Sequence, residues 1–395
     1  MKKLLGVALV AVGLVVGAQS GASAHVDKSD NVKLVSTFKY KIDPDNKFFT
    51  AGTDLAFSGK YVYAAQQGPE TAGIHIIDAS GKKPREVGFF KCSASQNDVA
   101  VVRPGLLANA YHSGNCGGPG GGVSLIDVRN PKRARVLGAV TNLPGGSHTL
   151  TVYPGKPIIY ASPGGLANGG GTEQILDVSN PRKPKVAATY LPSRIGCHDL
   201  TFSFTKERKL AVCAGLTETQ IWDVSDPLAP ETIGRIVNPL MFFPHSAAVT
   251  DDGRYLVLGD EAFAADDCVG GPLGALWVYD ISNPAAPVPM SYYGASRGPA
   301  VSSPEVDRGD WCTAHLFNFV PGTYTLVSSW YAAGMNVLDL SDPRMPREIA
   351  HYQEDETNYW SAYWYDGRIW ANDRERGALD VFEVKGIKEK KGGRG

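Results

Sequence analysis

The stretch from Leu276 to Gly294, LWVYDISNPAAPVPMSYYG, has the pattern of two strands joined by a tight turn. Apolar and aromatic residues lead up to Asp280, which favours a first strand. Asn283 and Pro284 then end this strand, because proline cannot donate a hydrogen bond within a sheet. Residues 288–293 regain the pattern of a strand, so the whole stretch is predicted to form a β-hairpin.

Near-copies of this hairpin recur along the chain, each with an acidic residue after an apolar run. These acids are Asp78, Asp127, Asp177, Asp223, Asp280, Asp339 and, in a degenerate copy, Glu383. Neighbouring acids are 44 to 59 residues apart. A repeat of this length that consists only of short strands is typical of a β-propeller.

The repeats share a more specific signature, an apolar run followed by Asp-Val-Ser-Asp/Asn-Pro-x-x-Pro. It is clearest in ILDVSNPRKP (175–184) and IWDVSDPLAP (221–230). On this signature the chain resembles the LVIVD-repeat β-propeller proteins over about residues 32–384. The resemblance implies a β-propeller and, often, secretion, but it implies little about activity.

Another predicted pair of strands precedes each hairpin, so each repeat supplies strands A, B, C and D of one blade. We therefore predict an all-β fold, a single seven-bladed β-propeller of four-stranded blades that covers residues 25–384. The last repeat ends after strand C, and residues 32–40 (VKLVSTFKY) have the pattern of the missing strand D. This N-terminal strand is expected to complete the last blade and close the ring, which removes an exposed sheet edge.

The two ends of the chain differ in character from the repeats. Residues 1–24 combine two lysines, a short apolar run and an Ala-Ser-Ala site, the pattern of a secretory signal peptide cleaved after Ala24. Their apolar run is too short to cross a bilayer, and no other stretch is long enough. We expect a secreted, extracellular monomer without a membrane span, in which the basic tail 385–395 is disordered.

Charge and cysteine content narrow the context further. The formal net charge is −1, which implies no basic face and makes nucleic acid an unexpected partner. Six cysteines in an exported chain suggest three disulfides, for which 15 pairings are possible in principle. Their places in the predicted loops favour the pairs Cys92–Cys116, Cys197–Cys213 and Cys268–Cys312.

Histidines gather at one structural position of the predicted blades. The loops that join strand D to strand A and strand B to strand C share one face of a propeller, here called the top. The residues that open strand A on this face are Thr53, Asn97, His148, His198, His245, His315 and Ser361. Imidazole is a common ligand of transition metals. We therefore predict a metal site formed by four of them, His148, His198, His245 and His315, with Cu or Fe favoured and Zn as an alternative. The competing interpretation is a ring of polar residues that bind each other and water.

Glutamates lie near three of these histidines in the sequence. Glu173, Glu218 and Glu261 fall in or beside the B–C region of the same blades. Carboxylates often accept a hydrogen bond from a metal-bound imidazole. Glu261 is also our candidate catalytic residue, as a ligand or a general base. The arrangement resembles, in architecture alone, the carotenoid cleavage oxygenases, which are seven-bladed propellers with four histidines on an axial iron.

Two functions are compatible with these features. The first is a Cu- or Fe-dependent oxidase or oxygenase that acts on a small or apolar substrate, with Zn-dependent hydrolysis as a variant. The second is a non-enzymatic extracellular propeller whose top face binds a small molecule, protein, glycan or cell-wall ligand. The sequence leaves open whether the protein is an enzyme, and the four-histidine column is the feature that separates the two hypotheses.

Overall fold

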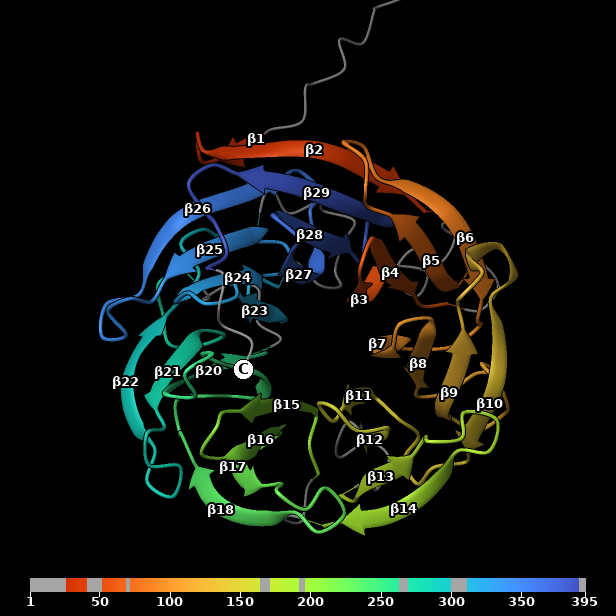
Figure 1. The fold of residues 1–395 in the computed structure, drawn as a ribbon. Coiled ribbons are helices and arrows are strands. Elements are labelled where there is room, and N and C mark those ends of the chain that lie inside the picture. Colours follow the sequence, from red (N-terminus) through yellow and green to blue (C-terminus); the bar gives the residue numbers. More distant parts are fainter. Residues whose placement is uncertain are drawn as a thin grey trace, which may run out of the picture.

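The computed structural model describes residues 26–40, 52–68, 72–163, 171–191, 196–262, 269–299 and 311–390. They form seven antiparallel sheets arranged in a ring (Figure 1). Across these described ranges there is no α-helix, and the one short helical turn is η2 (Pro131–Arg133). The prediction of an all-β, seven-bladed propeller is therefore confirmed. No helix within the described ranges is long and apolar enough to span a membrane.

The first four blades follow each other along the chain, and each contributes strands A to D in sequence order. Blade 1 contains β3 (Gly52–Ser58), β4 (Tyr61–Gln66), β5 (Gly73–Asp78) and β6 (Arg85–Lys91). Blade 2 contains β7 (Asp98–Arg103), β8 (Leu106–Tyr111), β9 (Gly122–Asp127) and β10 (Arg135–Thr141). Blade 3 contains β11 (Thr149–Val152), β12 (Ile158–Ser162), β13 (Glu173–Asp177) and β14 (Lys185–Tyr190). Blade 4 contains β15 (Asp199–Phe204), β16 (Lys209–Gly215), β17 (Glu218–Asp223) and β18 (Glu231–Ile236).

The last three blades continue this order, but the final two also take strands from the N-terminus. Blade 5 contains β19 (Pro244–Val249), β20 (Tyr255–Asp260), β21 (Leu276–Asp280) and β22 (Val288–Tyr293). Blade 6 contains β23 (Phe317–Phe319), β24 (Thr325–Ser329), β25 (Met335–Asp339), β26 (Arg347–Glu354) and the added β1 (Val26–Lys28). Blade 7 contains β27 (Tyr359–Tyr365), β28 (Arg368–Asp373), β29 (Ala378–Val384) and β2 (Val32–Lys39).

The N-terminal strand closes the ring, as predicted. β2 pairs with β29 from Val32 opposite Val384 to Lys39 opposite Ala378, and the two strands lie side by side in Figure 1. The Thr37 hydroxyl also donates to Asp380 Oδ1 at 2.6 Å, which fixes the register of this joint. The fifth strand of blade 6 was not predicted: β1 pairs with β26 at the outer edge of that blade.

The C–D turns hold neighbouring blades together. A Cβ atom on Gly88 in strand D of blade 1 would lie 2.0 Å from the carbonyl oxygen of Pro131 in blade 2. The same relation joins Gly234 in blade 4 to Pro284 in blade 5, at 1.9 Å. Only glycine permits so close an approach of two backbones. The repeated prolines therefore end one strand, and their turn packs against strand D of the preceding blade.

Two of the predicted disulfides are confirmed. Cys92 is bonded to Cys116, and Cys197 is bonded to Cys213. Cys312 is also disulfide-bonded, but its predicted partner Cys268 lies outside the described residues.

The chain ends are described only in part. The predicted signal peptide, residues 1–24, and residues 391–395 of the tail lie outside the described residues. Residues 385–390 differ from the expectation of a disordered tail, because they contact the propeller. Trp364 Nε1 donates to Glu389 Oε1 at 2.8 Å, and the Lys390 amide donates to the Pro321 carbonyl at 3.1 Å.

Candidate metal centre

The four histidines occupy equivalent backbone positions. In three blades the histidine amide donates to a carbonyl at the end of strand B, which gives the pairs His148–Ser162 (2.8 Å), His198–Ala214 (2.8 Å) and His315–Ser329 (3.0 Å). His245 lies in β19, where a bulge between Pro244 and Ser246 shifts the register. The histidine column inferred from the repeats is thus present in the structure, including at His148.

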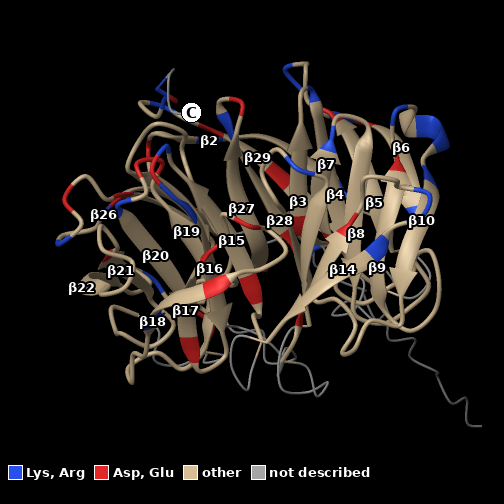
Figure 2. Ribbon diagram, turned by 60° about the horizontal axis from the view of Figure 1, so that its bottom comes forward, with Lys and Arg blue, Asp and Glu red and all other residues tan. Residues whose placement is uncertain are grey.

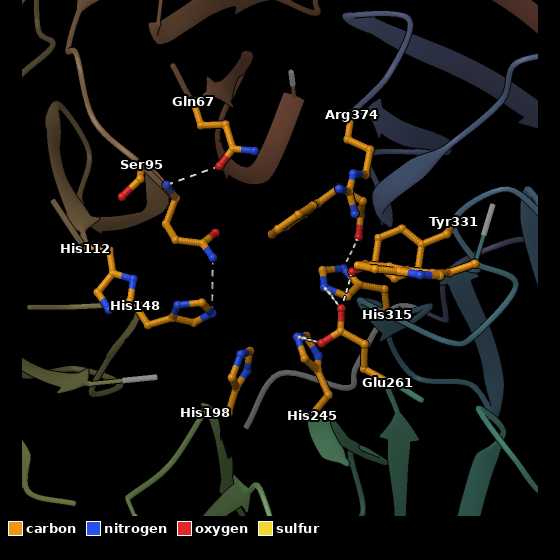
Figure 3. Close-up of a pocket in the computed structure, with 13 residues that line it drawn as sticks. Gln67, Ser95, His112, His148, His198, His245, Glu261, His315, Tyr331 and Arg374 are labelled. Atoms are coloured by element: carbon orange, nitrogen blue, oxygen red, sulfur yellow. Dashed lines mark hydrogen bonds and ion pairs between the residues drawn. The ribbon is translucent and has the colours of Figure 1, made fainter. Parts of the chain in front are cut away.

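The imidazoles stand side by side along one wall of a pocket (Figure 3). Ring centroids are 4.2 Å apart from His148 to His198, 4.2 Å from His198 to His245, and 4.3 Å from His245 to His315. His198, His245 and His315 are buried, and His148 is half-buried. The pocket holds about 310 Å³, which is enough for a small molecule.

A second column of residues lines the same pocket. Gln67, His112, Glu261 and Arg374 each follow directly after strand B of their blade. Because strand B ends on the top face, its next residue points toward the mouth of the pocket. Our sequence reasoning found only Glu261 among these four. The others could have been found by comparing the residue after strand B in all the repeats, as was done for the first residue of strand A.

Glu261 lies between two of the histidines. Its Oε2 is 3.4 Å from His245 Nε2, and its Oε1 is 3.6 Å from His315 Nε2. The Tyr331 hydroxyl donates to the same Oε1. His315 Nδ1 lies 2.5 Å from the Trp360 carbonyl oxygen, which only accepts, so Nδ1 carries the proton and Nε2 keeps its lone pair. A carboxylate and a lone pair that face each other need a proton or a metal cation between them.

Burial sets the protonation of the site. It lowers the pKa of His148 to about 3 and holds the pKa values of His198, His245 and His315 well below the ordinary value. All four rings are therefore neutral near pH 7, the form that binds metals. Burial also raises the pKa of Glu261 to about 8, so in the absence of a cation this carboxyl holds a proton at neutral pH.

Each of the four strand A histidines has one ring nitrogen to which no described residue forms a hydrogen bond. These atoms are Nδ1 of His148, His198 and His245, and Nε2 of His315. A buried polar atom without a partner costs ~1–3 kcal/mol, so four in one pocket are unusual for a purely structural cluster. Ligand atoms of His198, His245 and Glu261 lie within 4.8 Å of one another. This buried group has the spacing and the donor types of a transition-metal site.

Comparison with known families agrees with the fold. The LVIVD repeat family model matches residues 51–85 and 268–294. The first match covers β3 to β5 of blade 1, and the second contains the hairpin of blade 5 from which the repeat was recognised. The chain is a β-propeller that contains LVIVD repeats. No match was found among curated proteins. None of the four histidines lies in a matched segment, so the family match supports the fold and not the metal site.

The other three residues that open strand A on the top face link neighbouring blades of the propeller; they are Thr53, Asn97 and Ser361. The Ser361 hydroxyl donates to the Thr53 carbonyl at 2.9 Å, and the Thr53 hydroxyl donates to the Asn97 carbonyl at 3.1 Å. For these positions the interpretation as a structural polar ring is correct. The residue before Asn97, Gln96, has a left-handed backbone (φ 74°) and places its amide 3.4 Å from His148 Nε2. Such a conformation in a non-glycine residue is often found at functional sites.

Three aromatic residues and a cation complete the pocket. Trp311, Tyr331 and Trp360 line it together with Arg374. The Arg374 guanidinium lies 5.1 Å from the Trp311 ring centroid and 5.3 Å from each of the other two. The positive charge of Arg374 favours the ionised form of Glu261 and so lowers the pKa of that carboxyl. Burial raises the same pKa and has the larger effect.

The remaining two glutamates do not line the pocket, so the expected supporting role is not seen. Glu218 Oε1 accepts from Arg235 Nη1 at 2.5 Å, on a half-exposed part of blade 4. Glu173 is fully buried in blade 3 and accepts a hydrogen bond from the Ser162 hydroxyl at 2.7 Å. Its environment therefore differs from that of a solvated loop acid.

We expect Glu173→Gln to stabilise the protein at pH 8 and to do so much less at pH 5. Burial raises the pKa of Glu173 to about 8 in the folded state. Between an unfolded pKa of ~4.3 and this value, the unfolded chain releases the proton and the folded chain keeps it, so stability falls by up to ~1.4 kcal/mol per pH unit. Glutamine stays neutral and removes this loss.

Urea denaturation at the two pH values measures the difference. The matched control is Glu218→Gln, which changes a carboxylate paired at the surface and should show no such gain with pH. An equal shift of the Glu173→Gln midpoint at both pH values would contradict the assignment of a buried, protonated carboxyl.

Proposed function

We propose that this LVIVD-repeat propeller is a secreted, monomeric metalloprotein that oxidises a small or apolar substrate. His198, His245 and Glu261 hold the metal, with His148 and His315 beside them in the same pocket. Cu or Fe fits an oxidative reaction, whereas Zn in the same ligands would support hydrolysis. The predicted signal peptide and the two disulfides support an extracellular location.

One observation carries this proposal. Four neutral imidazoles converge in one pocket, and each retains a ring nitrogen without a hydrogen-bond partner. In a binding propeller without a metal such a set would be unfavourable, because each buried nitrogen loses its hydrogen bonds to water and gains no other partner. A metal ion supplies the missing partner for several nitrogens at once.

Hydrogen bonds to neighbouring residues orient two side chains of the proposed site. The Trp360 carbonyl fixes the tautomer of His315, and Tyr331 donates to Glu261. Metal-binding residues in proteins commonly have such partners. Glu261 has a further role in the proposal: once a metal displaces its proton, the carboxylate serves as ligand or as general base toward a substrate in the pocket.

The aromatic walls suit the proposed substrate. Trp311, Tyr331 and Trp360 offer ring faces to the pocket, and Phe243 packs against His198 and His245 at centroid distances of 4.8 and 5.6 Å. Such walls bind an apolar or aromatic molecule and limit the water around the metal.

Metal content is the decisive test. The untagged mature protein is analysed by elemental mass spectrometry beside the double variant His198→Ala/His245→Ala. We expect one equivalent of Cu, Fe or Zn per wild-type chain and none in the double variant, because the substitution removes two of the three clustered ligands.

His351→Gln is the matched control, because His351 lies at the edge of blade 6, where Asp27 and Ser29 bind its ring. It should keep the metal. Circular dichroism and thermal unfolding check that each variant is folded. A metal-free wild type that takes up none of the three metals on reconstitution would contradict the proposal and leave a binding propeller as the better hypothesis.

A further inference from the structure

The C–D turns of blades 1, 2 and 3 carry positive charge at equivalent positions. Three residues in each turn are cationic and exposed: Lys82, Lys83 and Arg85; Lys132, Arg133 and Arg135; Arg182, Lys183 and Lys185. The equivalent residues of blade 5 are Ala285, Ala286 and Val288. Blade 6 has two cations at these positions, Arg344 and Arg347, so all three positions are cationic only in the adjacent blades 1, 2 and 3. We call these nine residues the basic turn surface.

The near-neutral net charge led us to expect no basic face, and for these turns that expectation was wrong. Figure 2 shows Lys and Arg gathered around β6, β7 and β10. Net charge sums over the chain and does not report how charges of opposite sign are segregated among blades.

Only the inner residue of each turn is neutralised. Arg85, Arg135 and Lys185 lie 4.0, 3.7 and 3.9 Å from the aspartate that opens their turn. The six residues at the turn tips form no ion pair with any described residue. Like charges held together in this way repel each other, which costs stability unless a polyanion binds them.

Hydrogen bonds order the backbone in the turns of blades 2 and 3. The Asn130 side chain accepts from the Lys132 amide at 3.2 Å, and the Asn180 side chain accepts from the Arg182 amide at 3.1 Å. The turn of blade 2 is also seated on Gly88 of blade 1, as described above. A ligand that spans the blades therefore meets a surface whose backbone is already ordered, which lowers the entropy cost of binding.

Arginines line two adjoining depressions among these turns. One, of about 320 Å³, lies between blades 2 and 3 and is lined by Arg103, Arg129 and Arg182. The other, of about 460 Å³, is lined by Arg129, Arg133 and Arg135. Arg129 and Asp127 border both, so the depressions form one groove around the turn of blade 2. Guanidinium groups match phosphate oxygens in geometry and charge.

We propose that the basic turn surface binds a linear polyanion that carries phosphate groups along its chain. Cations repeat from blade to blade, so successive phosphates of one polymer meet successive turns. A bilayer fits less well, because peripheral membrane proteins add apolar anchors to their cations. The residues between the cations of the three turns are Pro84, Ala134 and Pro184, none of which is a large apolar anchor. The surface lies on the face opposite the histidine pocket, and the proposal does not depend on the metal.

Inorganic polyphosphate is the probe, titrated into the mature protein at several salt concentrations. We expect binding that weakens steeply with salt, since each phosphate contact releases counterions. Lys132→Gln/Arg133→Gln should weaken binding about tenfold and lower the slope of log K against log salt by about 1.5. The matched control, Lys206→Gln/Arg344→Gln, removes the same charge from turns of blades 4 and 6 and should change both values far less.

Several outcomes would overturn the proposal. They are an absence of polyphosphate binding at low salt, an equal loss of affinity in the two double variants, and equally tight binding of polyglutamate, which has carboxylates in place of phosphates. Binding to phosphatidylglycerol-containing vesicles without binding to polyphosphate would assign the surface to a membrane instead. Thermal unfolding and metal content of Lys132→Gln/Arg133→Gln should equal those of the wild type, which separates this test from that of the metal site.

Discussion

A chain that begins at residue 41 is expected to fail to fold, although it keeps every strand from β3 to β29. Without β2, strand β29 becomes an exposed edge, and blade 7 loses a strand that contributes Val32 and half-buried Leu34 to its core. The Tyr40 hydroxyl, which donates to Asn372 at 2.7 Å, is lost as well. Burial of an apolar side chain contributes ~1.5–3 kcal/mol, so the loss of several is comparable to the whole free energy of unfolding of a typical domain.

Circular dichroism and size-exclusion chromatography test this expectation. The matched control begins at residue 31, so it loses only β1, the added outer strand of blade 6. It should fold and elute at the same volume as the wild type. A synthetic peptide of residues 30–40 should restore folding to the longer truncation by taking the place of β2. A stable, cooperative fold in the chain that begins at residue 41 would show that the ring does not need its N-terminal strand.

Arg376→Met is expected to destabilise the protein by about 3–5 kcal/mol, because it leaves two buried carboxylates without their cation. Arg376 Nε lies 2.9 Å from Asp373 Oδ2, and its Nη2 donates to Asp380. Both aspartates are fully buried. Nη1 donates to Glu354 in blade 6, so this one side chain also joins the last two blades.

Urea denaturation measures the loss. Arg347→Met is the control: it breaks a 3.0 Å ion pair with Asp339 at the surface, and we expect a change below ~1 kcal/mol. Adding Asp380→Asn to Arg376→Met should recover part of the stability, since it removes one of the uncompensated charges. A loss in Arg376→Met no larger than that in Arg347→Met would contradict the assigned role.

The fold was predictable because its signals are local and repeated. The Asp-x-x-Asn/Asp-Pro turn marks a strand end in five of the seven repeats, and aligning the repeats on their acidic residue places every blade. Closure by residues 32–40 followed from counting strands. The fifth strand of blade 6 could not be predicted in this way, because β1 has only three residues and pairs at an edge that no repeat requires.

Residues of the candidate site could be predicted only where they occupy the same position in several repeats. His148, His198 and His245 were found because strand A begins at the same point in each blade. Gln96 was missed, since it lies in a loop whose path depends on tertiary contacts. Arg374 was missed because the position after strand B was not compared across the repeats. The sequence also overstated the role of Glu173 and Glu218, because nearness along the chain to the end of strand B does not say toward which side of the blade a side chain points.

The joint between β2 and β29 has a consequence for the order of events during synthesis. Thr37 and the aspartate it binds are 343 residues apart, so β2, which is made near the start of the chain, has to wait for β29, the last strand. Blades 1 to 5 complete themselves in the order in which they are made, from neighbouring segments of chain. The ring shuts only when residues 378–384 arrive. Until these residues are made, β2 has no partner in the ring and remains an unpaired strand.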